Sequence, residues 1–157
     1  MKAIYFDMDG TIADLYGQEK WLEQLRSEDT TPYEVAQPLV NLDHFNALCA
    51  AFDALGVTLG VISWASKDSE HYYKVRTKAA KLQWIKDHCP LLANEFHVLA
   101  YGRPKKTAAK IKEAILVDDN EKVRASWNGY TIDASDSRAM FAELEKVLNI
   151  LMGTLDN

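Results

Sequence analysis

The stretch that decides the fold of this chain is Met1-Lys-Ala-Ile-Tyr-Phe-Asp-Met-Asp-Gly-Thr11. The short apolar run 3–6 predicts a buried strand, and Gly10 predicts the turn that ends it. Asp7 and Asp9 would point the same way if the strand geometry persisted, because side chains alternate along a strand. Two like charges so placed repel each other, and a hard divalent cation such as Mg²⁺ takes carboxylate oxygens readily. The opening therefore predicts a metal-assisted site with an Asp as nucleophile or ligand.

Two later segments place polar side chains after apolar runs. Ser63 follows the β-branched run 57–62, and its hydroxyl suits either a phosphate oxygen or the cap of a helix. Lys105 and Lys106 follow Tyr101-Gly-Arg-Pro104. A lysine is a compact positive charge that suits a phosphate or a carboxylate, although a loop lysine is often simply solvated. Each of these residues is weak evidence when taken alone.

A further segment, Ala114-Ile-Leu-Val-Asp118-Asp119-Asn120, is again an apolar run that ends in acids. Alone, it is equally typical of a strand that leads into a helix with an acidic N-cap. Together, and in this order, the four segments resemble the haloacid dehalogenase (HAD)-like phosphohydrolase superfamily. The matching residues are Asp7-x-Asp9-Gly10-Thr11, Ser63, Lys105 and Asp118-Asp119. The resemblance spans residues 7 to 119, so it covers the whole expected catalytic core.

The resemblance implies a phosphatase that works through a covalent intermediate. Asp7 would attack phosphorus and form an aspartyl-phosphate. Asp9 would protonate the leaving oxygen and later help to deprotonate the attacking water. Superfamily members with an acid at the position of Asp9 are typically phosphatases, whereas dehalogenases lack that pattern.

The resemblance also implies two sets of binding residues. Mg²⁺ would be held by Asp7, the backbone carbonyl of Asp9 and Asp118, with Asp119 supporting or sharing the ion. The phosphoryl oxygens would be held by Thr11, Ser63 and Lys105. Lys106 is the alternative to Lys105 if the register of the loop differs by one residue.

The order of the apolar runs predicts an α/β fold. Five candidate strands alternate with helical patterns, at Ala3–Asp7, Val57–Ser63, Phe96–Ala100, Ala114–Asp118 and Tyr130–Ile132. Such alternation is typical of a doubly wound, three-layer parallel sheet with helices on both faces, the Rossmann-like fold of the HAD-like superfamily. Ligands in this architecture bind at the carboxyl ends of the strands, where all four motifs lie.

Three helical patterns carry apolar stripes. One lies at about residues 42–55 and another at about 137–152. The third stripe consists of Tyr72, Val75, Ala79, Leu82 and Ile85. Off this stripe lie Lys74, Lys78 and Lys81, which we interpret as part of a solvated helix face.

We expect a single domain over residues 1–157 with a small helical cap insert at about residues 13–41. Residues 18–26 predict a helix, with Trp21, Leu22 and Leu25 on its apolar side. Pro32 and Pro38 predict breaks after it. A small cap leaves the site open, so that the substrate could be large or a partner subunit could help to cover the site.

The composition is that of a soluble globular protein, with 48% hydrophobic and 26% charged residues among 157. No apolar run approaches the ~18 residues that a membrane span needs, and the N-terminal run is too short for a signal peptide. Cys49 and Cys89 lack metal or redox spacing, and the four histidines are scattered. We therefore expect a cytoplasmic protein with reduced core thiols and without a zinc site.

Charge is unevenly distributed along the chain. Residues 1–60 have a net charge of −7, residues 61–112 of +7 and residues 113–157 of −5. The basic middle could draw phosphorylated substrates toward the cleft, or it could simply be the solvated face of a lysine-rich helix. The overall acidic balance argues against a dedicated binder of duplex DNA.

The expected partner is a small-molecule phosphate ester. The chain looks most like small-capped members similar to 5′-deoxynucleotidases, which makes a nucleotide one candidate substrate. Trp21, Tyr33 and Trp64 could stack a base, although aromatic residues at such positions are more often core residues. A sugar phosphate and a 3′-phosphate on a nucleic-acid end are alternatives. We expect no membrane partner, and a monomer or a homodimer.

Two alternatives without turnover stay open. Receiver-type signalling domains also combine an acidic pair, an acceptor Asp, a hydroxyl and a lysine on a doubly wound sheet. Their acidic pair comes first and their acceptor stands alone on a later strand, whereas the first strand here carries Asp-x-Asp-Gly-Thr. The other alternative is a HAD-like protein that binds without turnover, although every expected catalytic side chain is present here.

Overall fold

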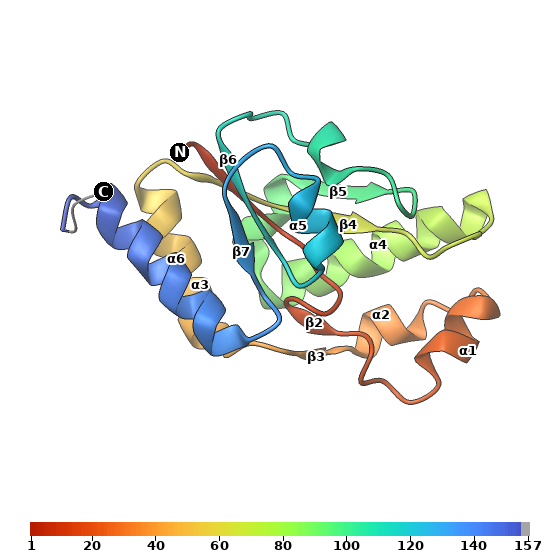
Figure 1. Cartoon of the computed structure of the whole chain (residues 1–157). Coiled ribbons are helices and arrows are strands. Elements are labelled where there is room, and N and C mark those ends of the chain that lie inside the picture. The colour runs from red at the N-terminus through yellow and green to blue at the C-terminus, as the bar shows by residue number, and fades with distance from the viewer. Residues whose placement is uncertain (155–157) are drawn as a thin grey trace.

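A five-stranded parallel sheet forms the centre of the protein in a computed structural model that describes residues 1–154 (Figure 1). Its strands are β1 (Ala3–Phe6), β4 (Thr58–Trp64), β5 (Phe96–Leu99), β6 (Ala114–Asp118) and β7 (Thr131–Asp133). Each coincides with a strand expected from the sequence, to within one residue at either end. The prediction of an α/β fold with a parallel sheet and flanking helices is confirmed.

The strands pair in the order β5-β4-β1-β6-β7, with β1 at the centre. Numbered along the chain, these five strands lie in the order 3-2-1-4-5, which is that of a doubly wound Rossmann-like sheet. Along the chain, β4 and β5 are added on one side of β1, and β6 and β7 then follow on the other side. The topological switch point of the sheet therefore lies at β1. The carboxyl ends of β4, β1 and β6 therefore meet at the edge of the sheet where ligands bind in this architecture.

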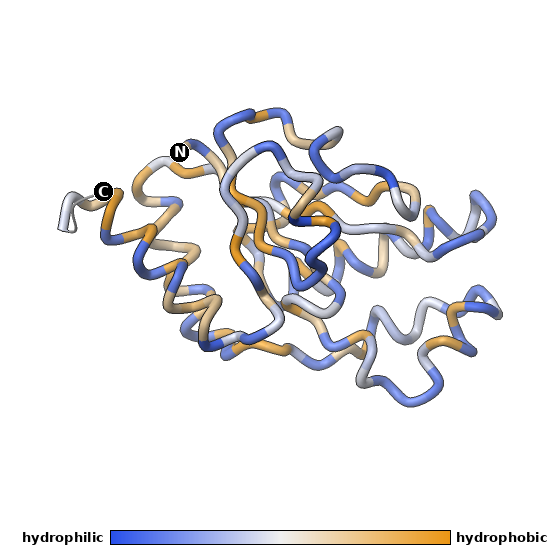
Figure 2. Tube along the Cα trace, viewed as in Figure 1, coloured by the Kyte–Doolittle hydropathy of each residue, from blue (hydrophilic) through white to orange (hydrophobic). Residues whose placement is uncertain are grey.

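One face of the sheet carries the larger core. Ile4 and Phe6 of β1 belong to it, and three helices contribute buried residues: α3 (Leu42–Ala54), α4 (His71–His88) and α6 (Ser137–Leu151). The strands appear as mostly hydrophobic segments at the centre of Figure 2, whereas the helices alternate between hydrophobic and hydrophilic residues. This alternation is expected for helices that bury one side against a sheet.

The opposite face is covered more thinly. Ala3 and Tyr5 of β1 belong to its smaller core, beside Val123 of the short helix α5 (Glu121–Ala125). Apolar residues of segment 108–111 also pack there, just after the 3₁₀ helix η2 (Lys105–Thr107). Asp7 continues the alternation of Ala3 and Tyr5, so its side chain is directed toward the face on which η2 lies.

Residues 13–41 form a small lobe beside the sheet, at the lower right of Figure 1. Strands β2 (Ala13–Asp14) and β3 (Gln37–Pro38) pair antiparallel at its base, and between them lie α1 (Trp21–Arg26) and α2 (Thr31–Val35). Helix α1 begins three residues later than expected. As expected, the first helix ends before Pro32, which itself lies in the first turn of α2, where a proline costs no hydrogen bond.

The lobe is held by α4, whose buried face differs from the prediction. The stripe through Tyr72 and Val75 is wrong, because their side chains are 72% and 54% exposed. Ile85 is buried as expected, and the remaining buried positions of α4 are Tyr73, Thr77, Lys81 and Trp84. The physical reason is that the lobe packs across α4: the Tyr73 hydroxyl donates to the Asp29 carbonyl at 2.9 Å, and Trp84 Nε1 donates to the Ala36 carbonyl at 2.8 Å.

Two further features complete the description. A 3₁₀ helix, η1 (Pro90–Asn94), connects α4 to β5. Cys49 and Cys89 are buried and unpaired, and burial raises the pKa of each thiol to about 12. Within residues 1–154, none of the helices combines the length and the apolar character that crossing a membrane requires.

Candidate functional site

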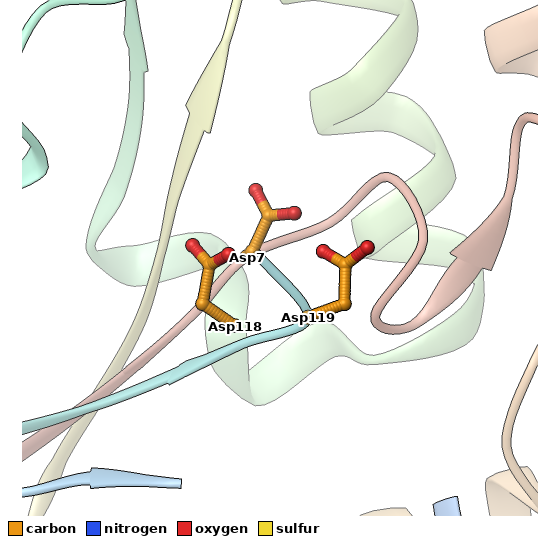
Figure 3. Close-up of side chains that lie close together, drawn as sticks. All are labelled: Asp7, Asp118 and Asp119. Atoms are coloured by element: carbon orange, nitrogen blue, oxygen red, sulfur yellow. The ribbon is translucent and has the colours of Figure 1, made fainter. Parts of the chain in front are cut away.

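Three aspartates meet at the carboxyl ends of β1 and β6. Asp7 follows β1, Asp118 ends β6 and Asp119 comes next, and each offers a carboxylate oxygen within 4.8 Å of those of the other two. Their side chains project into the same space in Figure 3. Asp7 and Asp118 are buried and Asp119 is half-buried. Neighbouring parallel strands thus bring together acids that are more than a hundred residues apart in the sequence.

Lys105 neutralises part of this acidic cluster. Its Nζ donates to Asp7 Oδ1 at 2.5 Å and to Asp118 Oδ2 at 2.7 Å, and its side chain is buried. Burial disfavours the charge of Lys105, but the two carboxylates outweigh this effect and raise the pKa of the ammonium. Lys106 is exposed and donates to Asn128 Oδ1 at 3.2 Å, so Lys105 is the lysine of η2 that lies in the cluster.

The residues after β6 hold the Asp118 carboxylate in a defined orientation. The backbone N–H of Asn120 donates to Asp118 Oδ1 at 2.9 Å, and the Asn120 side chain caps α5. Arg124 Nη1 donates to the Asp118 carbonyl at 2.8 Å, and its Nη2 pairs with Asp133 on β7. A capped helix directly after the strand therefore limits the movement of the acidic pair.

The Asp9 carboxylate is not part of the three-aspartate cluster. Strand β1 ends at Phe6, and the chain then enters a tight turn in which Gly10 has a φ of +85°. The strand geometry on which the expectation for Asp7 and Asp9 depended does not persist, although both residues line the same cleft. Among the described residues, the acidic cluster has no carboxylate from Asp9. Asp9 as a metal ligand through its backbone carbonyl stays a prediction.

The partner of Asp9 is Lys81, a residue that the sequence did not single out. Lys81 Nζ donates to Asp9 Oδ2 at 2.5 Å, to Ser63 Oγ at 2.9 Å and to the Trp64 carbonyl at 2.7 Å. The interpretation of Lys81 as part of a solvated face is wrong, because its exposed fraction is 0%. The signal that could have found it is the i, i+4 spacing of Tyr73, Thr77 and Lys81, which continues on one helix face to Trp84 and Ile85.

The two expected hydroxyls are both buried. The Ser63 hydroxyl accepts the hydrogen bond from Lys81 described above, on the side of β4 that faces α4. Thr11 lies in the tight turn after Asp9, and its Oγ1 has no hydrogen-bond partner among residues 1–154. Thr11 is not among the residues that line the cleft over the aspartates.

A cleft of about 660 Å³ opens above the aspartates. Asp7, Asp9, Lys105, Asp118 and Asp119 lie at its base. Five aromatic side chains also line it: Tyr16, Trp21, Tyr33, Trp64 and Tyr101. Two of them, Tyr16 and Tyr101, are well exposed. Trp64 Nε1 donates to the Arg103 carbonyl at 2.8 Å, and its ring lies 5.2 Å from that of Tyr101. The cleft thus joins a charged base to aromatic walls.

The net negative charge at the bottom of the cleft favours a divalent cation. Four carboxylates (Asp7, Asp9, Asp118, Asp119) face two ammonium groups (Lys81, Lys105), which leaves an excess of two negative charges. Burial and then Asp7 raise the pKa of Asp118 to about 6, and the same causes raise the pKa of Asp119. Because every acidic donor is a carboxylate oxygen, the cluster suits a hard ion rather than a thiophilic one. Asp7, Asp118 and Asp119 are therefore the residues that could hold a metal ion.

Comparison with protein-family models gave no match for this chain, and comparison with curated proteins gave none either.

Proposed function

We propose that this protein is a HAD-like phosphatase that hydrolyses a phosphate monoester with Mg²⁺ and forms an aspartyl-phosphate on Asp7. The observation that carries the proposal is the surroundings of Asp7 at the end of the central strand. One oxygen accepts from Lys105, and the carboxylates of Asp118 and Asp119 lie within 4.8 Å. A carboxylate nucleophile that attacks a dianion needs positive charge beside it, which Lys105 and a divalent cation held by the three acids would supply.

In the proposed reaction Asp7 acts as the nucleophile and Asp9 as the acid and base. Asp7 attacks phosphorus, and the bond from phosphorus to the leaving oxygen breaks as that oxygen takes a proton from Asp9. In the second step the Asp9 carboxylate takes a proton from water, the water oxygen attacks phosphorus, and inorganic phosphate leaves Asp7. Burial, the largest influence on Asp9, raises the pKa of its carboxyl, which supports a proton-donating role. Mg²⁺ held by Asp7, Asp118 and Asp119 would offset the charge of the phosphoryl group.

Lys105, Ser63 and Thr11 are the proposed ligands of the phosphoryl oxygens. Lys105 has its ammonium at the base of the cleft, in contact with the nucleophile. Ser63 is buried and, like Thr11, does not line the cleft; its hydroxyl accepts from Lys81 and makes only a long contact of 3.5 Å to Asp9 Oδ2.

The strand order bears on the receiver-like alternative. Receiver domains have the flavodoxin-like order 2-1-3-4-5, whereas the order here is 3-2-1-4-5. The nucleophile candidate also stands on the first strand, in the Asp-x-Asp-Gly-Thr segment. Both features favour the phosphatase over a phospho-acceptor domain.

The decisive experiment measures Mg²⁺-dependent turnover of p-nitrophenyl phosphate by the purified protein and by Asp7→Asn. We expect turnover that a chelator abolishes, and a loss on the order of 10³-fold or more in Asp7→Asn, because the nucleophile is removed. Asp53→Asn, an exposed acid on α3, is the matched control and should keep full activity. An acid-quenched phosphoprotein that forms in the wild type and is missing in Asp7→Asn would establish the intermediate.

A wild-type protein without turnover on a broad panel of phosphate esters would refute the phosphatase and favour a binding-only or phospho-acceptor protein. Phosphate release at an unchanged rate by Asp7→Asn would refute the covalent mechanism.

For the substrate, we propose a nucleotide, with lobe 13–41 acting as a small cap. The exposed rings of Tyr16, from the lobe, and Tyr101 line the cleft, with the partly buried Trp21 and Trp64 beside them, whereas Tyr33 is buried. Exposed aromatic rings near a phosphate site suit a planar base, because stacking contributes about 1–3 kcal/mol per base. Sugar phosphates and 3′-phosphorylated ends are the alternatives that the same panel tests.

The panel compares dUMP, dTMP, a sugar phosphate and a 3′-phosphorylated oligonucleotide. Tyr101→Ala should raise KM for the two nucleotides by about 5- to 100-fold if the ring stacks on the base, and should leave KM for the sugar phosphate unchanged. Tyr130→Ala, an exposed tyrosine outside the cleft, is the matched control. Equal preference for the sugar phosphate, with no effect of Tyr101→Ala, would contradict the nucleotide proposal.

A further inference from the structure

Lys81 is a buried ammonium whose donors are all used within the protein. An ammonium has three N–H groups, and those of Lys81 reach Asp9 Oδ2, Ser63 Oγ and the Trp64 carbonyl at 2.5 to 2.9 Å. Its Nζ also lies 4.7 Å from the centre of the Tyr33 ring. With no donor left over and an exposed fraction of 0%, Lys81 is not placed to bind a substrate directly.

Stability alone is a poor explanation for this arrangement. Burying an ion pair costs desolvation, and replacing such a pair by apolar residues is often neutral or stabilising. Lys78, one turn earlier on α4, is exposed, so the helix does not place its lysines inside by default. The contacts of Lys81 therefore point to a role in orienting the groups that it touches.

The contact with Asp9 has a directional consequence. Lys81 holds Oδ2, whereas Oδ1 is buried and has no hydrogen-bond partner among residues 1–154. Asp9 lines the cleft together with Asp7. Because the Lys81 ammonium can only donate, its contact fixes one Asp9 oxygen and with it the orientation of the whole carboxyl.

The contact with Ser63 acts in the same way. Its Oγ accepts from Lys81, which leaves the hydroxyl hydrogen as the group that can be given to another oxygen. The nearest alternative, Asp9 Oδ2, lies 3.5 Å from Ser63 Oγ, at the outer limit of a hydrogen bond. Lys81 thus fixes two side chains near the carboxyl ends of two neighbouring strands, β1 and β4.

We propose that Lys81 is a positioning residue that holds Asp9 and Ser63 in place, so that the Asp9 carboxyl can give its proton to the leaving oxygen. This inference rests on the phosphatase proposed above and adds to it a residue on α4, outside the four motifs. Lys81 acts through Asp9 and contacts neither substrate nor phosphorus.

The test exploits how much help a leaving oxygen needs. A p-nitrophenolate departs readily without a proton, whereas an alkoxide requires one. In Lys81→Met, which removes the ammonium and keeps the length of the side chain, we expect kcat/KM to fall about 100-fold for glycerol phosphate and less than about 10-fold for p-nitrophenyl phosphate. Lys78→Met is the matched control on the same helix and should change neither value.

A double-mutant cycle shows whether Lys81 acts through Asp9. In an Asp9→Asn background, Lys81→Met should have little further effect on glycerol phosphate, because the group that it positions can no longer donate a proton. Lys81→Arg, which retains a charged donor, should recover part of the activity on the alkyl ester.

Equal losses on the two esters, or full additivity in the cycle, would overturn the positioning role while leaving the phosphatase intact. Circular dichroism and the melting temperature check the fold of each variant. If Lys81→Met does not fold, Lys81→Gln replaces it, and failure of both to fold would mean that Lys81 is a structural residue only. If the wild type shows no turnover or Asp7→Asn retains it, the phosphatase itself fails and the inference fails with it.

Discussion

Two buried lysines flank the segment that carries Asp7 and Asp9, and their surroundings differ. Lys105 contacts the carboxylates of Asp7 and Asp118, and Asp119 lies within reach of both. Lys81 contacts one carboxylate, one hydroxyl and one carbonyl. The first lysine is outnumbered by acids, whereas the second is balanced by a single one.

This difference in charge distinguishes the Lys105 side, where acids are in excess, from the Lys81 side, where each N–H group of the lysine already has a partner. Around Lys105 the three carboxylates leave a net charge of −2, and the raised pKa values of Asp118 and Asp119 reflect the cost of holding it in a buried place. Around Lys81 a single carboxylate, that of Asp9, balances the ammonium when ionised, and all three N–H groups of the lysine have partners. A divalent cation would therefore be drawn to the Lys105 side, and the Lys81 side would keep its geometry with or without one.

The largest expected effect comes from removing the outnumbered lysine. Lys105→Met leaves buried carboxylates without a cation, so in the presence of a chelator we expect the free energy of unfolding to fall by about 3 kcal/mol. Turnover should fall on the order of 10²-fold or more, because Lys105 is a proposed phosphate ligand. Thermal unfolding and phosphatase assays with and without Mg²⁺ measure both, and added Mg²⁺ should restore part of the stability.

Lys106→Met is the matched control for that experiment. Lys106 is exposed and bonds only to Asn128 among the residues described, so its loss should change stability by less than about 0.5 kcal/mol. If the two variants behave alike, the difference between the buried and the exposed lysine carries no functional meaning.

A smaller effect concerns pH in the absence of metal. The pKa of Asp118 is about 6 in the folded protein and near its ordinary value of 3.8 when unfolded, so the folded state binds more protons between these values. Stability due to this group is therefore greatest below about pH 4 and is lost as the pH rises to about 6, by about 1–3 kcal/mol. The measurement is the difference in unfolding free energy between wild type and Asp118→Asn from pH 4 to pH 7.

Bound Mg²⁺ should reverse this loss of stability with rising pH, because the cation and the proton compete for the same carboxylate oxygens. We expect Mg²⁺ to raise the melting temperature of the wild type more at pH 7 than at pH 5, and to have a much weaker effect on Asp118→Asn. A Mg²⁺ effect that is independent of pH would contradict the assignment of the excess charge to this side of the site.

The smallest expected effect is that of a side chain added at Gly10, next to Asp119. A Cβ there would lie 2.8 Å from Asp119 Oδ2 and 2.9 Å from Tyr16, in a backbone with φ of +85°. Gly10→Ala should cost about 1–2 kcal/mol of stability and weaken the melting shift caused by Mg²⁺, because Asp119 must move. Gly56→Ala has a similar φ of +76° with open space around it, so it should show the backbone cost alone. An equal Mg²⁺ response in both variants would remove Asp119 from the proposed metal site.

The strands and the acidic cluster could be predicted because their causes are local. Apolar runs such as 3–6 and 114–117 can be buried only as strands at this length, and parallel pairing then carries Asp7 and Asp118 to one edge. Lys105 follows from its place in the order of motifs. The choice between Lys105 and Lys106 depended on the register of a 3₁₀ turn, which propensity does not determine.

The direction of Asp9 and the burial of Lys81 could not be predicted in the same way. The turn at Gly10 ends the alternation of the strand, so the spacing of Asp7 and Asp9 stops being informative. Lys81 looks solvated in the sequence because its partners lie 17, 18 and 72 residues away. Lysine is rarely buried, and only the lobe that packs over α4 makes this one an exception.

By itself, the sequence determined a parallel α/β sheet and the acids at its carboxyl edge, because hydrophobic periodicity and turn chemistry act over a few neighbouring residues. The tertiary structure alone decided which acid each lysine pairs with, and hence which part of the site is left negatively charged. The physical reason is that pairing depends on distances between segments far apart in the chain, and the energy of a buried charge depends on all the groups around it.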